Sequence, residues 1–266
     1  MSDEATKRPP HGVLANPWES LRRHTPARIA LGRAGPGLPT RALLEFGLAH
    51  ARARDAVHAA PDFDALESAL HAAGHAPVRV RSAVPDRARY LTRPDLGRRL
   101  EEPGAELLDE IAARSAPPEI VVSIEDGLSA LAIQRHALPL LAALCAHNPG
   151  RWKGAAVVLA EQGRVALGDE IGERLGAQLV VVMIGERPGL SSPDSLGLYI
   201  THAPRRGRTD AERNCISNVR PAGLDYPEAA RRLDWLCSAA LARGLTGVGL
   251  KDDSGALPAA PSALYL

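Results

Sequence analysis

One apolar run, Gln178-Leu-Val-Val-Val-Met-Ile184, constrains the fold more than any other part of the sequence. Its residues after Gln178 are mostly β-branched, and no polar residue alternates with them, so a strand made from them is apolar on both faces. Such a strand belongs in the middle of a sheet with helices on both sides, as in parallel α/β proteins. The run therefore predicts a three-layer architecture.

Further strands and helices alternate around this run. Short apolar runs predict strands at 119–124, 155–159 and 196–201, and helical periodicity separates or follows them at 128–141, 169–175 and 225–244. Asp225 and Pro227 are typical of a helix start, and Gly244 is typical of a helix end. The alternation predicts a Rossmann-like α/β/α domain with a mostly parallel sheet over residues 116–252.

The part of the chain before this domain has a different pattern. Residues 18–115 are predicted to be mainly helical, with a first helix that Thr40 can cap and a shorter one opened by a capping box of Asp64 and Glu67. The first helix places Leu44, Leu48 and Ala51 on one face, which we expect to pack on the later strands. Residues 1–17 and 253–266 are proline-rich with little apolar pattern, and both are expected to be flexible.

Composition excludes several classes of protein. The net charge is +1 and the arginines are scattered, so dedicated nucleic-acid binding is not expected. No apolar stretch approaches the roughly twenty residues that a membrane-spanning helix needs, and the polar N-terminus does not resemble a signal peptide. Three cysteines without close metal-ligand spacing indicate a reducing compartment. We expect a cytoplasmic protein.

Two polar segments directly follow predicted strands, where ligands bind in open α/β sheets. Glu125-Asp126-Gly127 follows the strand at 119–124, and either ligand binding or helix capping would explain its carboxylates. Gly185-Glu186-Arg187-Pro188-Gly189 follows the buried run at 178–184. A charged pair between glycines at that point has no packing role, so this segment is the stronger candidate for a site.

Other segments give weaker signals. The stretches Tyr90–Arg98 and Arg213–Asn218 are either exposed loops or the lining of a pocket, and the second is too irregular to be core. The glycine patterns at 32–37 and 244–249 have the wrong spacing for a dinucleotide loop. Phosphate-binding, zinc-hydrolase and serine-hydrolase motifs do not occur, and the dispersed histidines suggest neither a catalytic base nor a metal ligand.

Taken together, six ordered segments resemble the small subunit of ethanolamine ammonia-lyase. They are Arg28-Ile-Ala-Leu-Gly-Arg-Ala-Gly-Pro36, Tyr90-Leu-Thr-Arg-Pro-Asp-Leu-Gly-Arg-Arg99, Val122-Ser-Ile-Glu-Asp-Gly-Leu-Ser129, Asp169-Glu-Ile-Gly172, Gly185-Glu-Arg-Pro-Gly-Leu190 and Asn214-Cys-Ile-Ser-Asn218. The resemblance covers about residues 18–250. It implies an adenosylcobalamin-dependent lyase that converts ethanolamine to acetaldehyde and ammonia by radical chemistry.

The same resemblance implies particular partners and contacts. The resemblance implies that a large TIM-barrel subunit binds ethanolamine within a higher heteromeric oligomer. It also implies that this chain alone is inactive and contributes no catalytic or metal-binding residue. By position, Val165, Glu186 and Cys215 match the residues of the family that contact cobalamin. Whether the complex is enclosed in a bacterial microcompartment stays open.

Two other functions stay open as alternatives. One is a non-catalytic Rossmann-like cobalamin-binding protein. The other is a nucleotide-dependent enzyme, a hypothesis that the glycine spacings weaken. Some cobalamin proteins ligate cobalt with the histidine of a DxHxxG motif, but here Ala69 precedes His71 at the aspartate position. We therefore expect no histidine–cobalt ligation from this chain.

Overall fold

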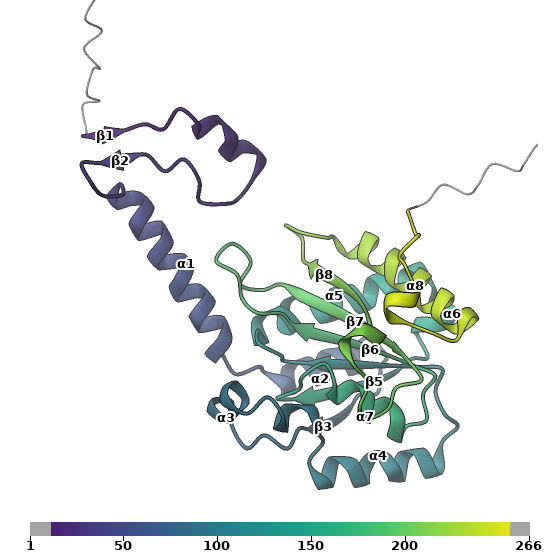
Figure 1. The fold of residues 1–266 in the computed structure, drawn as a ribbon. Coiled ribbons are helices and arrows are strands. Elements are labelled where there is room, and N and C mark those ends of the chain that lie inside the picture. The colour runs from purple at the N-terminus through teal and green to yellow at the C-terminus, as the bar shows by residue number, and fades with distance from the viewer. Residues whose placement is uncertain (1–11, 256–266) are drawn as a thin grey trace, which may run out of the picture.

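The structure, a computed structural model, describes residues 12–255 and contains one large sheet (Figure 1). Its six strands are β3 (Val78–Arg81), β4 (Ile120–Glu125), β5 (Ala156–Glu161), β6 (Leu179–Gly185), β7 (Leu196–His202) and β8 (Asn214–Val219). They lie in the order β3-β5-β4-β6-β7-β8. The first four are parallel, while β7 is antiparallel to both β6 and β8. The prediction of a mostly parallel sheet is confirmed.

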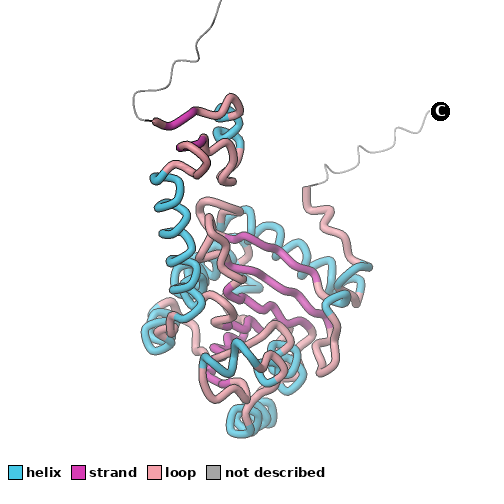
Figure 2. Tube along the Cα trace, turned by 60° about the vertical axis from the view of Figure 1, so that its left-hand side comes forward, coloured by secondary structure: helices cyan, strands magenta, loops and turns pink. Residues whose placement is uncertain are grey.

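Eight α-helices accompany the sheet in the described part of the chain. They are α1 (Thr40–His58), α2 (Phe63–Ala72), α3 (Arg87–Thr92), α4 (Glu102–Arg114), α5 (Ala130–His147), α6 (Pro149–Trp152), α7 (Leu167–Arg174) and α8 (Tyr226–Arg243). Short 3-10 helices occur at η1 (Glu19–His24), η2 (Leu96–Arg98), η3 (Asp210–Glu212) and η4 (Gly247–Gly249). Figure 2 shows the strands side by side with helices around them. None of the helices within residues 12–255 has the length and apolar character that a membrane crossing requires.

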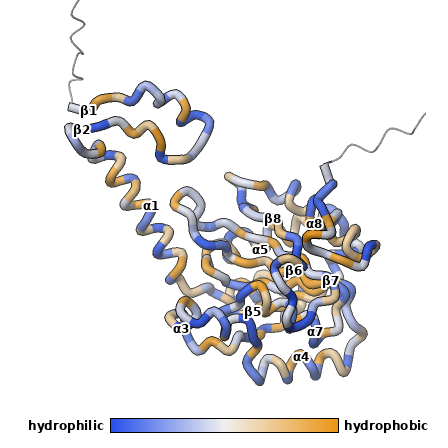
Figure 3. Tube along the Cα trace, in the orientation of Figure 1, coloured by the Kyte–Doolittle hydropathy of each residue, from blue (hydrophilic) through white to orange (hydrophobic). Residues whose placement is uncertain are grey.

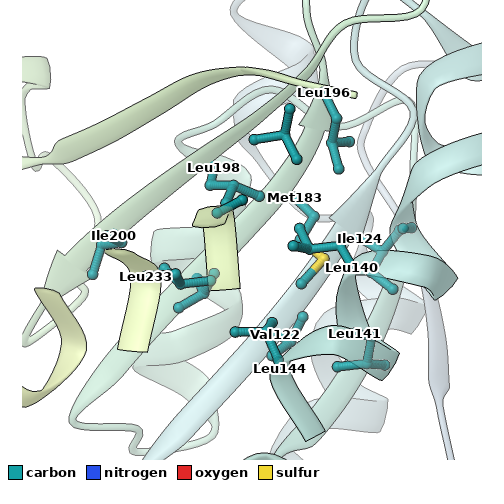
Figure 4. Packing of buried hydrophobic residues seen from close by; sticks show 14 of the residues in the cluster. Val122, Ile124, Leu140, Leu141, Leu144, Met183, Leu196, Leu198, Ile200 and Leu233 are labelled. Atoms are coloured by element: carbon teal, nitrogen blue, oxygen red, sulfur yellow. The ribbon is translucent and has the colours of Figure 1, made fainter. Parts of the chain in front are cut away.

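The apolar run at 178–184 explains the three layers. Alternate residues of β6 point to opposite faces of the sheet, and Val181 and Val182 belong to different core clusters. On one face, α5 and α8 pack over the central strands, with Leu140 and Leu144 near Val122 (Figure 4). On the other face, α4 and α7 cover the same strands. The strand is buried on both sides, as its pattern predicts.

The expected packing of the N-terminal helices holds for α2 but is wrong for α1. Phe63, Leu66 and Leu70 of α2 join the main core. In contrast, Leu44 and Leu48 of α1 are 68% and 53% exposed, and this helix leads away from the sheet (Figure 1). Its N-terminal end, at Thr40, follows a small antiparallel pair of β1 (Val13–Leu14) and β2 (Arg33–Ala34). An amphipathic pattern predicts a partner surface, but it does not say which chain supplies that surface.

Several local details differ from the sequence-based expectations. The side chain of Asp62, not Asp64, accepts the capping hydrogen bond of α2, and α1 begins after Pro39 without a side-chain cap. Residues 78–81 form an edge strand that the helical assignment of 18–115 did not include. The segment 213–218, expected to be irregular, contributes strand β8, in which Ile216 and Val219 reach the core across a shift in the pairing register with β7. Asp225 and Gly244 cap α8 as expected.

The ends of the chain were expected to be flexible over residues 1–17 and 253–266. Residues 1–11 and 256–266 lie outside the described part. Among residues 12–17, Val13 and Leu14 form β1, which pairs with β2.

The connections of the sheet create a crevice at the carboxyl ends of its parallel strands. The chain leaves β4 into α5 on one face and leaves β5 into α7 on the opposite face. Loops that diverge in this way leave room between them, and ligands bind there in open α/β sheets.

Candidate functional site

A cavity of about 590 Å³ lies at this edge of the sheet. Its volume is in the range of small-molecule sites, which is roughly 300–1,000 Å³. The loops after β4, β5 and β6, the residue before β7 and the end of β8 all contribute to it. The lining includes Pro26, Tyr90, Leu128, Arg164, Val165, Ile184, Glu186, Ser195, Tyr199 and Asn218. The structure thus brings two predicted site residues, Val165 and Glu186, to one cavity.

Glu186 follows β6 and is held in a defined orientation. Its Oε2 atom accepts a hydrogen bond from the backbone N–H of Asn218 at 3.1 Å and another from the hydroxyl of Ser195. Its Oε1 atom has no donor among residues 12–255. A Cβ atom at Gly197 would lie 3.1 Å from Oε1, so the glycine leaves room for the carboxylate. Glu186 can therefore present one acceptor oxygen to a ligand.

Two glycines allow the Glu186 loop to approach the loop after β4. A Cβ atom at Gly127 would lie 2.3 Å from the carbonyl oxygen of Gly185, and one at Gly185 would lie 2.1 Å from that of Ser129. Gly127 also has a positive φ of 57°, which side-chain-bearing residues rarely adopt. The glycines of both predicted segments thus serve close backbone packing below the cavity.

Val165 lies in the turn between β5 and α7, which several buried groups fix. The hydroxyl of Tyr90 donates to the carbonyl of Gly163 at 2.8 Å, and the N–H of Gly163 donates to Asp126 at 3.2 Å. The N–H of Arg164 donates to the carbonyl of Gly97 at 2.8 Å. Val165 is half-buried, so its methyl groups offer a small apolar surface to the cavity. Residues 164–166 lead through this turn into α7.

Tyr90 also organises two arginines beside the cavity. The guanidinium carbon of Arg164 lies 4.1 Å from the centre of the Tyr90 ring, and that of Arg87 lies 4.6 Å from it. Arg87 additionally pairs with Asp126 at 3.1 Å. Such cation–π contacts stabilise a charged group next to an aromatic face. The stretch 90–98 was expected to be either an exposed loop or the lining of a pocket, and it contains both. Tyr90 lines the cavity, while Arg93 and Asp95 form an exposed ion pair.

Cys215 lies beside the cavity rather than in its lining. It is on β8 directly opposite Tyr199, so the two side chains share one face of the sheet. Desolvation raises the pKa of its thiol, with hydrogen bonds to Ser217 and Tyr199 opposing the rise. A thiol in this state is a poor nucleophile. The position suits a small packing residue at the margin of the cavity.

Glu125 and Asp126 do not cap the following helix, so that alternative is wrong. Both side chains are fully buried beneath the turn at 162–165. Burial raises the pKa of Glu125 well above its ordinary value, and Ser123 donates a hydrogen bond to it at 2.9 Å. Burial also raises the pKa of Asp126 to about 6, with the guanidinium of Arg87 limiting the rise. These carboxyl groups support the turn and do not line the cavity.

Sequence reasoning missed Ser195 as part of the site, and it included Tyr90 and Asn218 only as the ends of two stretches that either line a pocket or form exposed loops. Asn218 has a positive φ of 60°, a conformation that asparagine tolerates, and this directs its N–H toward Glu186. Within residues 12–255, no three His, Cys, Asp or Glu side chains gather closely enough to hold a metal ion. His71 is exposed on α2, away from the cavity lining.

The chain is similar to known proteins over nearly its whole length. Residues 15–251 match the family described as ethanolamine ammonia-lyase light chain (EutC). The chain is 57% identical over 254 residues to the ethanolamine ammonia-lyase small subunit of Ralstonia nicotianae, covering 95% of this chain and 94% of that protein. It is 57% identical over 241 residues to the protein of the same description from Azotobacter vinelandii, with 90% and 89% coverage. A third such relative, from Pseudomonas fluorescens, is 56% identical with 90% and 88% coverage.

Proposed function

The chain belongs to the ethanolamine ammonia-lyase light-chain family, and on that premise we propose that it is the small subunit of an adenosylcobalamin-dependent lyase. In this proposal it acts with a large subunit to convert ethanolamine to acetaldehyde and ammonia. Its own part is to complete the cofactor site along the edge formed by Val165, Glu186 and Cys215. Membership of the family, together with the cavity that contains the first two residues, is the observation that carries the proposal.

The chemistry of the cavity fits one edge of a corrin. A corrin is a broad apolar disc fringed with amide side chains, so it needs apolar contacts and hydrogen-bond acceptors together. Val165, Leu128 and Ile184 provide apolar contacts on the cavity wall. The Oε1 atom of Glu186, which receives no donor from residues 12–255, can accept from an amide N–H. Ser195 and Asn218 fix the carboxylate beforehand, so little orientation entropy is lost on binding.

The residues of this chain position the cofactor and shield it from water. When bound, adenosylcobalamin supplies the radical that starts the reaction. The turn at 162–165 rests on buried Tyr90 and Asp126, which makes the apolar contact of Val165 rigid. The thiol of Cys215 stays protonated at neutral pH because its pKa is raised. The proposal therefore assigns no catalytic residue to this chain.

Reconstitution of the two subunits tests the proposal. We expect acetaldehyde release only when this chain, the large subunit and adenosylcobalamin are all present. Unchanged activity after omission of this chain would overturn the proposal. If the chain instead binds cobalamin alone and never associates with a large subunit, the non-catalytic cobalamin-binding alternative is correct. Tight binding of a nucleotide, measured by calorimetry, would favour a nucleotide-dependent enzyme.

A further inference from the structure

Exposed apolar side chains are concentrated in one part of the molecule, which we name the N-terminal projection (residues 13–58, comprising β1, η1, β2 and α1). Nine of the thirteen large hydrophobic residues that are exposed within residues 12–255 belong to it. They are Leu14, Trp18, Leu21, Ile29, Leu38, Leu43, Leu44, Phe46 and Leu48. Figure 3 shows the projection, with its hydrophobic stretches, standing away from the sheet. Exposed apolar side chains that are concentrated in this way are typical of an interaction site.

The outer half of α1 is apolar on two sides. Leu44 and Leu48 are four residues apart and share one side of the helix, while Leu43 and Phe46, three apart, share another. All four are exposed, and only Ala49 and Ala56 of this helix are buried. A helix that lay on a flat surface would need a single apolar face. This pattern instead suits a partner that surrounds the projection.

The projection is continuous with the candidate site. Pro26, in the loop between β1 and β2, lines the same cavity as Glu186. A second cavity, of about 360 Å³, lies between α1 and the loop after β6, with Leu48 and Leu190 in its lining. The guanidinium of Arg28 donates to the carbonyl of Leu190 at 3.4 Å. A partner protein that covers the cavity at Glu186 would therefore contact the N-terminal projection as well.

We propose that the N-terminal projection is a docking element for the large subunit, which covers Leu43, Leu44, Phe46 and Leu48. This inference rests on the proposed function, because it assigns a surface to the partner that the function requires. Charge disfavours pairing of two projections from two copies of this chain, since residues 13–58 contain seven arginines and only three carboxylates. The same excess of positive charge predicts acidic groups around the apolar contact on the large subunit.

A charge substitution on α1 tests the inference by binding rather than by activity. We would immobilise the large subunit and titrate full-length chain carrying Leu44→Glu and Leu48→Glu, with wild type in parallel. Burying two carboxylates in an apolar contact should weaken binding at least roughly tenfold. The matched control carries Leu107→Glu and Val248→Glu, which are 40% and 84% exposed but lie outside the projection, and it should bind like wild type.

The outcomes separate the two proposals. If wild type and the α1 variant bind the large subunit equally, the docking role is overturned while the proposed function stands. If wild type does not bind at all, the proposed function fails and the docking role fails with it. Light scattering of the chain alone shows whether a second copy of this chain occupies the surface. A wild-type dimer that the α1 variant converts to monomer would identify a second copy as the occupant and overturn the inference. Circular dichroism of each variant verifies that α1 stays folded.

Discussion

The backbone N–H of Asn218 donates to Oε2 of Glu186 at 3.1 Å, which joins the end of β8 to the loop after β6. The two residues are 32 positions apart, and the contact exists because β7 turns back and β8 returns to the same edge of the sheet. Ser195 donates to the same oxygen. Glu186 is therefore a fixed acceptor rather than a mobile surface charge.

Glu186→Ala should weaken cobalamin binding by the reconstituted complex. The substitution removes the Oε1 acceptor and also leaves Ser195 and the N–H of Asn218 without their partner. Loss of one hydrogen bond of about 1.5 kcal/mol corresponds to a roughly tenfold higher Kd, measured by cofactor titration. Glu186→Gln keeps an acceptor oxygen and the side-chain shape, so its effect should be smaller. Equal affinity of wild type and the alanine variant would remove Glu186 from the site.

Gly197→Ala should disturb the same carboxylate from the other side. The new Cβ atom would lie 3.0 Å from Cγ and 3.1 Å from Oε1 of Glu186, so the side chain must shift by a few tenths of an ångström. We expect a several-fold loss of cofactor affinity and a change in the free energy of unfolding below about 1 kcal/mol. Gly154→Ala is the control, because a Cβ atom there meets nothing within 4 Å. Indistinguishable titrations for the two variants would contradict the steric argument.

The core of the fold could be predicted because its signals are local. The apolar pattern of 178–184 alone requires a strand buried on both faces, and that is how β6 lies. The edge strand β3 was missed because it is only four residues long and alternates with arginine, so its pairing with β5 depends on the rest of the sheet. The exposure of α1 could not be predicted either. An apolar stripe looks the same whether its partner is this chain or another one.

The candidate site could be predicted only in part, because some of its contacts depend on strands that are distant in the sequence. Position after a buried strand identified Glu186, since carboxyl ends of strands are where ligands bind. No local signal in the sequence shows that Ser195 and Asn218 contact Glu186, because both contacts depend on the antiparallel return of β7 and β8. Glu125 and Asp126 satisfied the same positional rule as Glu186 and yet point into the core. Side-chain direction at a strand end is set by the packing of neighbouring loops.

Tyr90→Phe should loosen the turn that carries Val165. It deletes the hydroxyl that donates to the carbonyl of Gly163 at 2.8 Å, which leaves a buried acceptor unsatisfied. The expected cost is about 1–2 kcal/mol in the free energy of unfolding, with faster hydrogen exchange at the amide of Arg164. Tyr226→Phe removes a bond of the same length, to His136, at a distant position. That control should lose stability without changing exchange at Arg164, and equal exchange in both variants would refute a local role for Tyr90.

The raised pKa of Asp126 predicts a specific pH dependence of stability. Because burial raises its pKa to about 6 in the folded chain, the folded state holds a proton that the unfolded state releases near its ordinary pKa of about 4. The stabilising effect of this proton is complete below about pH 4 and is lost as pH rises through about 6. Two pKa units correspond to roughly 3 kcal/mol.

Asp126→Asn isolates this contribution from that of the other carboxylates. Asparagine keeps one of the two acceptor oxygens, which can accept from Gly163 or from Arg87, and it does not titrate, so the loss of the other bond does not vary with pH. Urea unfolding of both proteins between pH 4 and 7 gives the stability of wild type minus that of the variant. We expect this difference to fall by roughly 3 kcal/mol over that range and then to level off. Exposed pairs such as Arg93–Asp95 contribute equally to the stability of both proteins, so their contributions cancel in the difference. A difference that stays constant with pH would show that Asp126 is ionised throughout, and that its pair with Arg87 outweighs the cost of burial.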